Sequence, residues 1–467
     1  MGFVSAMLGV WLIAQGIGCT EEQKDSYVFV ILNQQSPVHY EAAQQLASHI
    51  ISESKQIDLS CVVHIASEEW PDLAVWTYFP LLESLSKQHG HNSSWVVLLE
   101  EWAIVRLKKL VGILQDYPSA QLLFIGRAVK DEEETIIHHY ARVDRKHPFL
   151  FPDARAGVIL STPLLRRLAE RWSNTSMHPS SDFTIDAQYE FAKFINSCGS
   201  ELSHHEGLCV LEKPGCAVAF NPSRKCERIV NAHDVHFAVK SCGQFHAERL
   251  PVIQSTWLKD ATNYAIYSDV EDAAYGTASL GIPNTERGHC GKTMAIIRHA
   301  AQLDSFQWLA VVDDDTLISV PRLCALLSCY NSKDHVAIGE KYGYGATSAR
   351  GYGYITGGGG MIFSKTLVEQ LAVPGTCECP SNDIPDDMFL GMCLKRLSVP
   401  IVHSSAFHQG RPIDYPKELL EGELPVSFHR YWMVEPRQVY ARWLDHSSDK
   451  KHSSGGDFLP VSVHTEL

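Results

Sequence analysis

Positive charge is in short supply in this sequence. Its 467 residues carry 40 Lys and Arg against 54 Asp and Glu, which gives a formal net charge of −14 and a pI of about 5.9. No long run of Lys or Arg occurs anywhere in the chain. Because proteins that bind the phosphate backbone usually carry a basic face, the composition argues against nucleic acid as a partner.

Long apolar runs are also lacking after the first twenty residues, "MGFVSAMLGVWLIAQGIGCT". This run is short for a membrane span, and the small residues Gly16 and Gly18 suit cleavage nearby. The sequence therefore predicts a signal peptide over residues 1–19 and no transmembrane anchor. The run has no Lys or Arg at its start, so a buried N-terminal helix or a signal anchor are the alternatives.

Two Cys-x-x-Cys motifs, the pattern typical of zinc sites, are lacking, although the chain has 13 cysteines. That number favours disulfides and an oxidising compartment. Asn92 and Asn174 begin glycosylation sequons. The final residues, "HTEL", are a variant of the signal read by the endoplasmic reticulum (ER) retrieval receptor. Together these features predict a protein of the ER lumen.

The sequence contains one unit twice. "WVVLLEEW" at 95–102 and "WLAVVDDDT" at 308–316 are each followed by an apolar Ile-Gly strand, "LFIGRA" and "VAIGEK". "GVILSTPLLRRLA" and "GMIFSKTLVEQLA" come next, then "DFTIDAQYEF" and "DIPDDMFLGM". Matched blocks in one order indicate an internal duplication of about 200 residues.

Short apolar strands alternate with helical patterns in both copies, beginning with "YVFVIL" at 27–32 and "VHFAVK" at 235–240. This alternation predicts an α/β fold with a mainly parallel sheet in each unit. The predicted organisation is a first unit over 20–212, a linker over 213–227, a second unit over 228–446 and a flexible, Gly/Ser-containing tail over 447–467.

Three carboxylates, Asp313 to Asp315, leave the predicted strand at its C-terminal end, where ligands of parallel sheets bind. Adjacent carboxylates repel one another, and a divalent cation offsets that repulsion. Hard oxygen ligands favour Mg²⁺ or Mn²⁺, which often bridge to substrate phosphates. The alternative is an acidic turn exposed to water.

Other short motifs in the second unit suit such a site. "TGGGG" at 356–360 would let backbone approach a ligand closely, unless it is a flexible linker. "GHCGKT" has two residues between its glycines where a P-loop needs four, so nucleotide hydrolysis is rejected, although Lys292 could reach a diphosphate. "PDDMFLG" offers a base in Asp386 or Asp387, or else caps a helix. His408, in "FHQG", follows a terminal strand and could ligate a metal.

These motifs, together with "FAVKSCGQFHAERLPVIQSTW", resemble the Fringe-type β1,3-glycosyltransferases over residues 234–410. The resemblance implies a GT-A fold in each unit and an inverting, nucleotide-sugar-dependent transferase. The duplicated N-terminal unit and the C-terminal signal narrow the resemblance to a two-unit, ER-resident branch of this family. That branch transfers glucose from UDP-glucose to O-linked fucose on thrombospondin type 1 repeats, with Mn²⁺ or Mg²⁺.

Residue roles follow from the same resemblance. It implies metal ligands at Asp313, Asp315 and His408, and a catalytic base at Asp387 with Asp386 beside it. It places the nucleotide sugar against Ser241, Arg249, Asp269, Lys292, Asp313, Asp314, Gly357, Gly358, Gly359 and Gly360.

The first copy departs from this pattern. Glu100 and Glu101 stand for two of the aspartates, Trp102 replaces the third, and the glycine run is missing, although Asp186 stands opposite Asp387. We therefore expect the first unit neither to bind metal nor to catalyse, and to serve in acceptor recognition or support. Two alternatives remain for the whole chain. One is a related transferase using UDP-galactose or a UDP-N-acetylhexosamine, and the other is a non-enzymatic ER lectin or quality-control protein.

Overall fold

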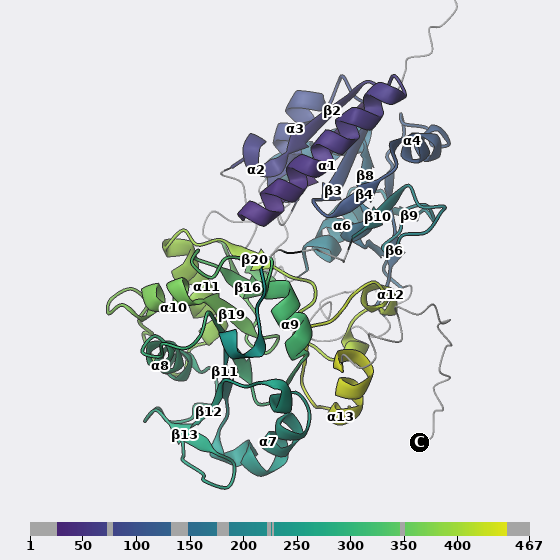
Figure 1. Cartoon of the computed structure of the whole chain (residues 1–467). Coiled ribbons are helices and arrows are strands. Elements are labelled where there is room, and N and C mark those ends of the chain that lie inside the picture. The colour runs from purple at the N-terminus through teal and green to yellow at the C-terminus, as the bar shows by residue number, and fades with distance from the viewer. Residues whose placement is uncertain are drawn as a thin grey trace, which may run out of the picture.

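The computed structural model describes residues 26–71, 78–131, 148–174, 186–221, 226, 228–345 and 351–445. The predicted signal peptide, the predicted tail and its "HTEL" lie outside these residues. Among the helices described, none combines the length and apolarity needed to cross a membrane. Two α/β units form the molecule; the colours of the first run from purple to teal and those of the second from teal to yellow (Figure 1). This confirms the predicted fold class.

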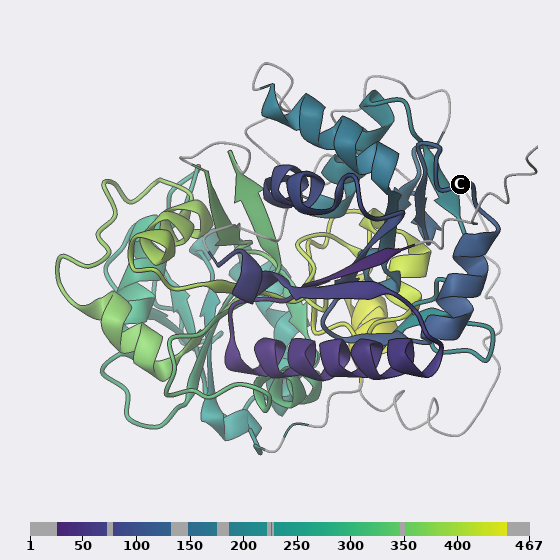
Figure 2. The ribbon, with the colours of Figure 1, turned by 90° about the horizontal axis from the view of Figure 1, so that it is seen from above.

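The first unit is built on a six-stranded sheet in which one strand, β8, runs antiparallel to its neighbours. The sheet order is β2 (Cys61–Ile65), β1 (Tyr27–Leu32), β3 (Trp95–Glu100), β8 (Val158–Ser161), β5 (Phe124–Gly126), β9 (Leu202–His204). Its helices are α1 (Pro37–Gln56), α2 (Ala66–Glu69), α3 (Leu82–His89), α4 (Leu107–Gln115), α5 (Thr162–Ser173) and α6 (Ala187–Ser197). The long helix α1 runs beside β1 (Figure 2).

The second unit repeats this arrangement and adds one edge strand. Its order is β13 (Thr277–Ser279), β12 (Tyr264–Ser268), β11 (Val235–Lys240), β14 (Trp308–Asp313), β19 (Met361–Ser364), β16 (Ala337–Gly339), β20 (Ile401–His403). Strand β19 runs antiparallel, as β8 does. Its helices are α7 (His246–Ser255), α8 (Cys290–Ala300), α9 (Val320–Leu327), α10 (Lys365–Ala372), α11 (Asp386–Arg396), α12 (Lys417–Glu421) and α13 (Pro436–Val439). The equivalent order of strands supports the duplication predicted from the sequence.

The centre of the second sheet is buried on both faces, which explains why β14 and β19 are apolar runs rather than alternating patterns. In β14 the side chains of Trp308, Ala310 and Val312 enter one core, and those of Leu309 and Val311 enter the other. This continuous burial ends at Asp313, where the chain reaches the edge of the sheet. The aspartates therefore leave a rigid, fully packed strand.

Smaller strand pairs extend each unit. They are β4 (Ala103–Val105) with β10 (Val218–Phe220), β6 (Ala128–Val129) with β7 (Phe151–Pro152), β15 (Thr316–Ile318) with β21 (Ser427–His429), and β17 (Lys341–Tyr344) with β18 (Tyr352–Ile355). The β4–β10 pair corrects the predicted linker, because residues up to Phe220 pack with the first unit.

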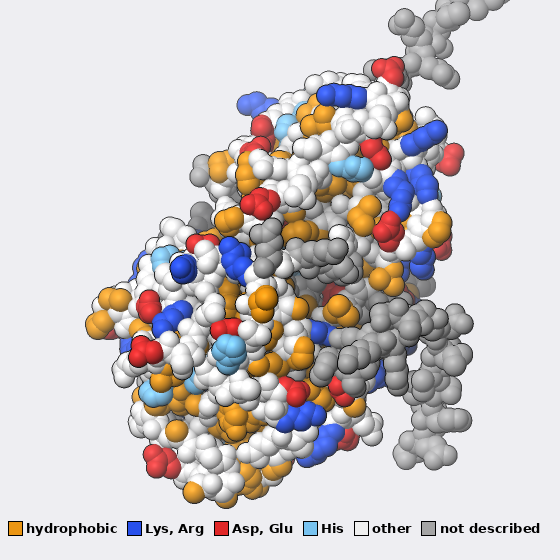
Figure 3. Space-filling model, viewed as in Figure 1, with side chains coloured by type: hydrophobic (Ala, Val, Ile, Leu, Met, Phe, Trp, Pro, Cys, Tyr) orange, Lys and Arg blue, Asp and Glu red, His pale blue; other side chains and the backbone are white. Residues whose placement is uncertain are grey.

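Disulfides were expected from the cysteine content, and four are present among the described residues: Cys209–Cys216, Cys226–Cys329, Cys290–Cys379 and Cys377–Cys393. Asn92, the acceptor of the first sequon, is exposed, as glycosylation requires. On the face seen in Figure 3, basic and acidic side chains are interspersed rather than gathered into a stripe of one sign.

Candidate active site

The three aspartates after β14 take three different sets of partners. Asp313 lies 3.1 Å from Lys240 Nζ at the end of the neighbouring strand β11. Asp314 is buried and accepts hydrogen bonds from Ser241 Oγ at 2.7 Å and from Arg249 Nη1 at 2.8 Å. Asp315 faces the same Arg249 nitrogen at 3.1 Å. The carboxylate of Asp314 is therefore fixed by two side-chain hydrogen bonds within the protein, and Asp313 and Asp315 lie on either side of it in the chain.

The side chains suited to a metal ion are Asp313, Asp315 and His429, whose ligand atoms all lie within 4.8 Å of one another. His429 Nε2 lies 3.1 Å from Asp315 Oδ1 and 3.8 Å from Asp313 Oδ2. The antiparallel pairing of β15 with β21 places His429 opposite Thr316 and so beside Asp315. Two carboxylates and an imidazole form a donor set that Mn²⁺ accepts, so the residues fit the expected cation.

His408, the predicted ligand, is not part of this group, which corrects that assignment. Its side chain is buried, with Nδ1 2.9 Å from the carbonyl oxygen of Ser427 and Nε2 3.2 Å from Glu423 Oε2. Its ring also stacks on Phe428 at a centroid distance of 4.4 Å. Both nitrogens therefore face other partners, and His408 supports the strand that carries His429.

Asp386 and Asp387 begin helix α11 and differ in their surroundings. Asp386 Oδ2 accepts hydrogen bonds from Lys240 Nζ at 2.6 Å and Thr293 Oγ1 at 2.5 Å. Burial alone would raise the pKa of Asp386, but Lys240 and Thr293 lower it to about 2. For Asp387, burial and the neighbouring charge of Asp386 raise the pKa to about 6. Of the two, Asp387 is the one suited to accept a proton near neutral pH.

The glycine run, whose members include Gly357, Gly358 and Gly360, lies between these groups. The N–H of Gly357 points at Asp387 Oδ2, 3.4 Å away. A Cβ on Gly358 would come within 2.3 Å of His429 Nδ1, and Gly360 has a φ of +103°. A side chain at Gly358 would displace His429, and one at Gly360 would strain the turn. Glycine is therefore required at both positions.

The remaining predicted donor-site residues lie at the same edge of the sheet. Lys292 is buried and donates to the carbonyl oxygen of Ser241 at 2.6 Å, and burial lowers its pKa. Asp269 accepts from the N–H of Gly243 at 2.9 Å. The guanidinium of Arg249 lies over the Phe245 ring, 3.8 Å from its centroid. The structure thus brings all predicted residues except His408 to one edge of the second sheet.

Besides His429, sequence analysis did not predict Lys240 and His289. Lys240 is buried between Asp313 and Asp386, and although burial acts against its charge, these carboxylates raise its pKa above the usual value. His289 precedes α8, where burial and Lys240 lower its pKa. Its motif "GHCGKT" is explained by packing, because a Cβ on Gly288 would meet the backbone of Ile384 at 2.2 Å.

In the first unit, the residues that stand for the aspartates are used differently. Glu101 is buried and pairs with His39 Nδ1, whose Nε2 lies 2.9 Å from the hydroxyl of Tyr330 in the second unit. Trp102 packs edge-on against the same His39 ring. Asp186 accepts from the N–H groups of Gln188 and Tyr189 as a helix cap. Of these contacts, the one between His39 and Tyr330 joins the two units.

Comparison with known proteins gives a consistent family assignment. A family model described as Fringe-like matches residues 21–189 and 230–451. The Beta-1,3-glucosyltransferase of Mus musculus is 42% identical over 433 residues, which cover 90% of this chain and 87% of that protein. The Homo sapiens protein of the same name is 42% identical over 435 residues, covering 91% and 86%. The solved galactosyltransferase LgtC covers 48% of this chain and 97% of its own at 10% identity and a TM-score of 0.28, too low to argue from.

Proposed function

Because the chain belongs to the Fringe-like glycosyltransferases, we propose that it transfers glucose from UDP-glucose to the 3-hydroxyl of O-linked fucose on thrombospondin type 1 repeats. The relatives that match along almost the whole chain are named for β1,3-glucosyl transfer, which supports glucose as the donor sugar. The fucose acceptor comes from the resemblance of the two-unit architecture. We also place the protein in the ER lumen, on the basis of its N-terminal apolar run, its disulfides and its HTEL ending.

The observation that carries this proposal is the meeting of Asp313, Asp315 and His429 with Asp387 at one sheet edge. The first three would hold Mn²⁺ or Mg²⁺. When bound there, the ion supplies Lewis-acid stabilisation to the charge that develops on the diphosphate. Lys292, near Ser241, would add a second positive charge for the diphosphate.

Asp387 is proposed as the general base. Its pKa of about 6 leaves it ionised near pH 7 yet basic enough to take the proton of the fucose hydroxyl as that oxygen attacks the anomeric carbon. Attack opposite the departing UDP inverts the sugar configuration. Asp386 is unsuited to this role, because its hydrogen bonds with Lys240 and Thr293 lower its pKa to about 2 and make it a weak base.

The test is transfer to fucosylated and unfucosylated thrombospondin repeats with UDP-glucose, UDP-galactose and UDP-N-acetylhexosamines, read by mass shift. We expect a hexose increment from UDP-glucose on the fucosylated repeat alone. Efficient transfer from another donor would replace glucose in the proposal, and transfer to the unfucosylated repeat would overturn the acceptor. Asp387→Asn serves as the inactive control.

A further inference from the structure

A cavity of about 680 Å³ lies between the two units, away from the aspartates of the second. We call it the interunit pocket. Its first-unit wall includes Asn33 after β1, Glu100 at the end of β3 and Asp186 at the start of α6. These positions correspond to those that build the active site in the second unit. The interunit pocket is therefore the ligand crevice of the first unit, and its size falls within the range of small-ligand sites.

The pocket is held open by bonds that cross between the units. Gln34 donates to the carbonyl oxygen of His403 at 2.9 Å and accepts from its N–H at 2.7 Å. Arg155, which is buried, donates to Glu423 at 2.7 Å and to the carbonyl oxygen of Leu419 at 2.9 Å. Because both walls are fixed in this way, the site is preformed, and a ligand needs little reorganisation to enter it.

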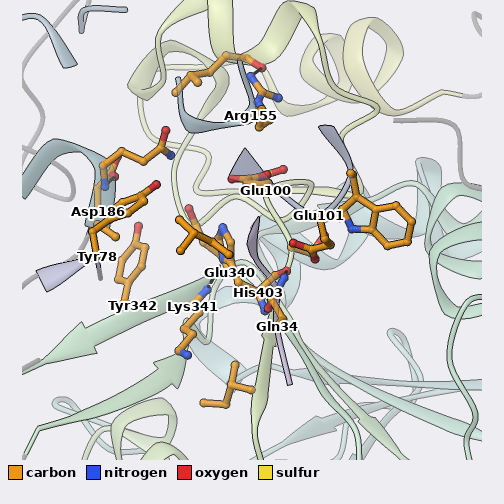
Figure 4. Close-up of a pocket in the computed structure, with 18 of the residues that line it drawn as sticks. Gln34, Tyr78, Glu100, Glu101, Arg155, Asp186, Glu340, Lys341, Tyr342 and His403 are labelled. Atoms are coloured by element: carbon orange, nitrogen blue, oxygen red, sulfur yellow. Dashed lines mark hydrogen bonds between the residues drawn. The ribbon is translucent and has the colours of Figure 1, made fainter. Parts of the chain in front are cut away.

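The chemistry of the lining selects the ligand class. Carboxylates of Glu100, Asp186 and Glu340 face the interior together with the rings of Tyr78 and Tyr342 (Figure 4). Carboxylates accept hydrogen bonds from hydroxyl groups and repel phosphates. The guanidinium of Arg155, the cation best suited to phosphate, is already paired with Asp153 and Glu423. Two lysines also line the pocket: Lys395 donates to the carbonyl oxygen of Gly351 at 2.6 Å, and burial lowers the pKa of Lys341 to about 8. With three carboxylates beside these cations, the lining favours hydroxyl-rich, uncharged ligands over nucleotide sugars.

The backbone conformation of Tyr78 is unusual for its residue type. It is not glycine, yet its φ is +55°, and its side chain is buried and stacked on Phe191 at a centroid distance of 4.9 Å. Such a conformation is unfavourable for a bulky residue and persists where the surrounding structure enforces it, commonly at ligand sites. The strained residue lies in the wall of the pocket.

The pocket also shares a wall with the catalytic site. Glu340 Oε2 accepts from the N–H of Gln409 at 2.6 Å, and the side chain of Gln409 accepts from the N–H of Gly359 at 3.0 Å. The backbone carbonyl of Glu340 also accepts from the N–H of Thr356 at 2.9 Å. A ligand against Glu340 thus lies two hydrogen bonds from the glycine run.

We propose that the interunit pocket binds a neutral saccharide, so that the non-catalytic unit acts as a lectin module on the same chain. The saccharide could be free or carried by a glycoprotein, since the lining recognises the sugar in both. This proposal does not depend on which sugar the second unit transfers.

The test is saturation-transfer NMR on the full chain in chelator, followed by calorimetry. The panel is glucose, fucose, mannose, N-acetylglucosamine, the glucosyl-β1,3-fucose disaccharide and an N-glycan core. We expect a panel member to bind, and Glu100→Gln combined with Tyr78→Phe to weaken it by at least about tenfold. Asp387→Asn should bind it as the native chain does. Tyr342→Phe replaces the double variant if that variant does not fold, as judged by thermal unfolding.

The proposal would be overturned if no panel member binds, if the pocket variants bind as well as the native chain, or if Asp387→Asn abolishes binding. Displacement of the saccharide by UDP-glucose in chelator would also do so, because it would place the sugar in the donor crevice. Comparison of the free sugar with a glycopeptide carrying it identifies the source. If the glycopeptide binds more strongly, the natural ligand is a glycoprotein. If the two bind equally, the saccharide alone is recognised. Both results support a neutral saccharide as the ligand class.

Discussion

His429 Nε2 lies 3.1 Å from Asp315 Oδ1, although the two residues are far apart in the sequence. Strand β21 brings them together by pairing with β15. This contact identifies His429, and not His408, as the imidazole of the proposed metal site.

The first prediction separates the two histidines. His429→Ala should weaken Mn²⁺ binding and lower transfer by about 100-fold, because one of three protein ligands is lost. His408→Ala should leave Mn²⁺ affinity nearly unchanged and lower the melting temperature instead, since it removes a buried ring. Titration of each variant with Mn²⁺, followed by electron paramagnetic resonance, measures the affinities. The reverse pattern would restore His408 as the ligand.

The second prediction concerns pH. Because burial and Asp386 raise the pKa of Asp387 to about 6, its basic form is lost as the pH falls through that value. Transfer should therefore be constant above about pH 7 and fall about tenfold per pH unit well below 6. The pH profile of kcat/KM measures this, with thermal unfolding at each pH as the control. A fall in kcat/KM centred near pH 4 would show that burial and Asp386 do not raise the pKa of Asp387.

A third prediction tests Lys240, which bridges Asp313 and Asp386. Lys240→Met removes the cation between two carboxylates, leaves buried Asp386 charged without its partner and should lower the free energy of unfolding by about 3 kcal/mol. Adding Asp386→Leu should recover part of that loss, because the unpaired charge is removed as well. Urea unfolding of the two variants gives the comparison. A double variant less stable than the single one would contradict this account.

The fourth prediction concerns the junction between the units. Arg155→Met should break the link to Glu423 and Leu419, with a loss of about 3 kcal/mol, since Glu423 stays buried without its cation. Calorimetry should then show the two units unfolding in separate transitions. Arg155→Lys keeps the charge but not the forked geometry, and should give an intermediate effect. A single unshifted transition in both variants would exclude a coupling role for this residue.

Much of the fold followed from local patterns. The strands at 27–32, 235–240 and 308–313 are predominantly apolar, and a run buried on both faces is recognisable from its composition. The placement of Asp313 to Asp315 at a sheet edge followed from the same reasoning. These features depend on neighbouring residues in the chain, which is why the sequence alone could predict them.

The features that sequence analysis missed depend on distant contacts. Phe-His occurs at 245–246, 407–408 and 428–429, and only the pairing of β15 with β21 selects the third. Lys240 could not be identified, because its partners lie on β14 and α11. The disulfide pairs and the interunit pocket likewise arise from tertiary packing. The sequence around a lysine at a strand end does not indicate which carboxylates will surround it in the fold.

The Cys290–Cys379 bridge joins the start of α8 to the segment that leads into Asp386 and Asp387, and Cys377–Cys393 anchors that segment to α11 itself. The position of these two aspartates therefore depends on disulfide formation. A newly made chain whose thiols have not yet paired would hold Asp386 and Asp387 loosely, and their geometry would be complete only after thiol oxidation.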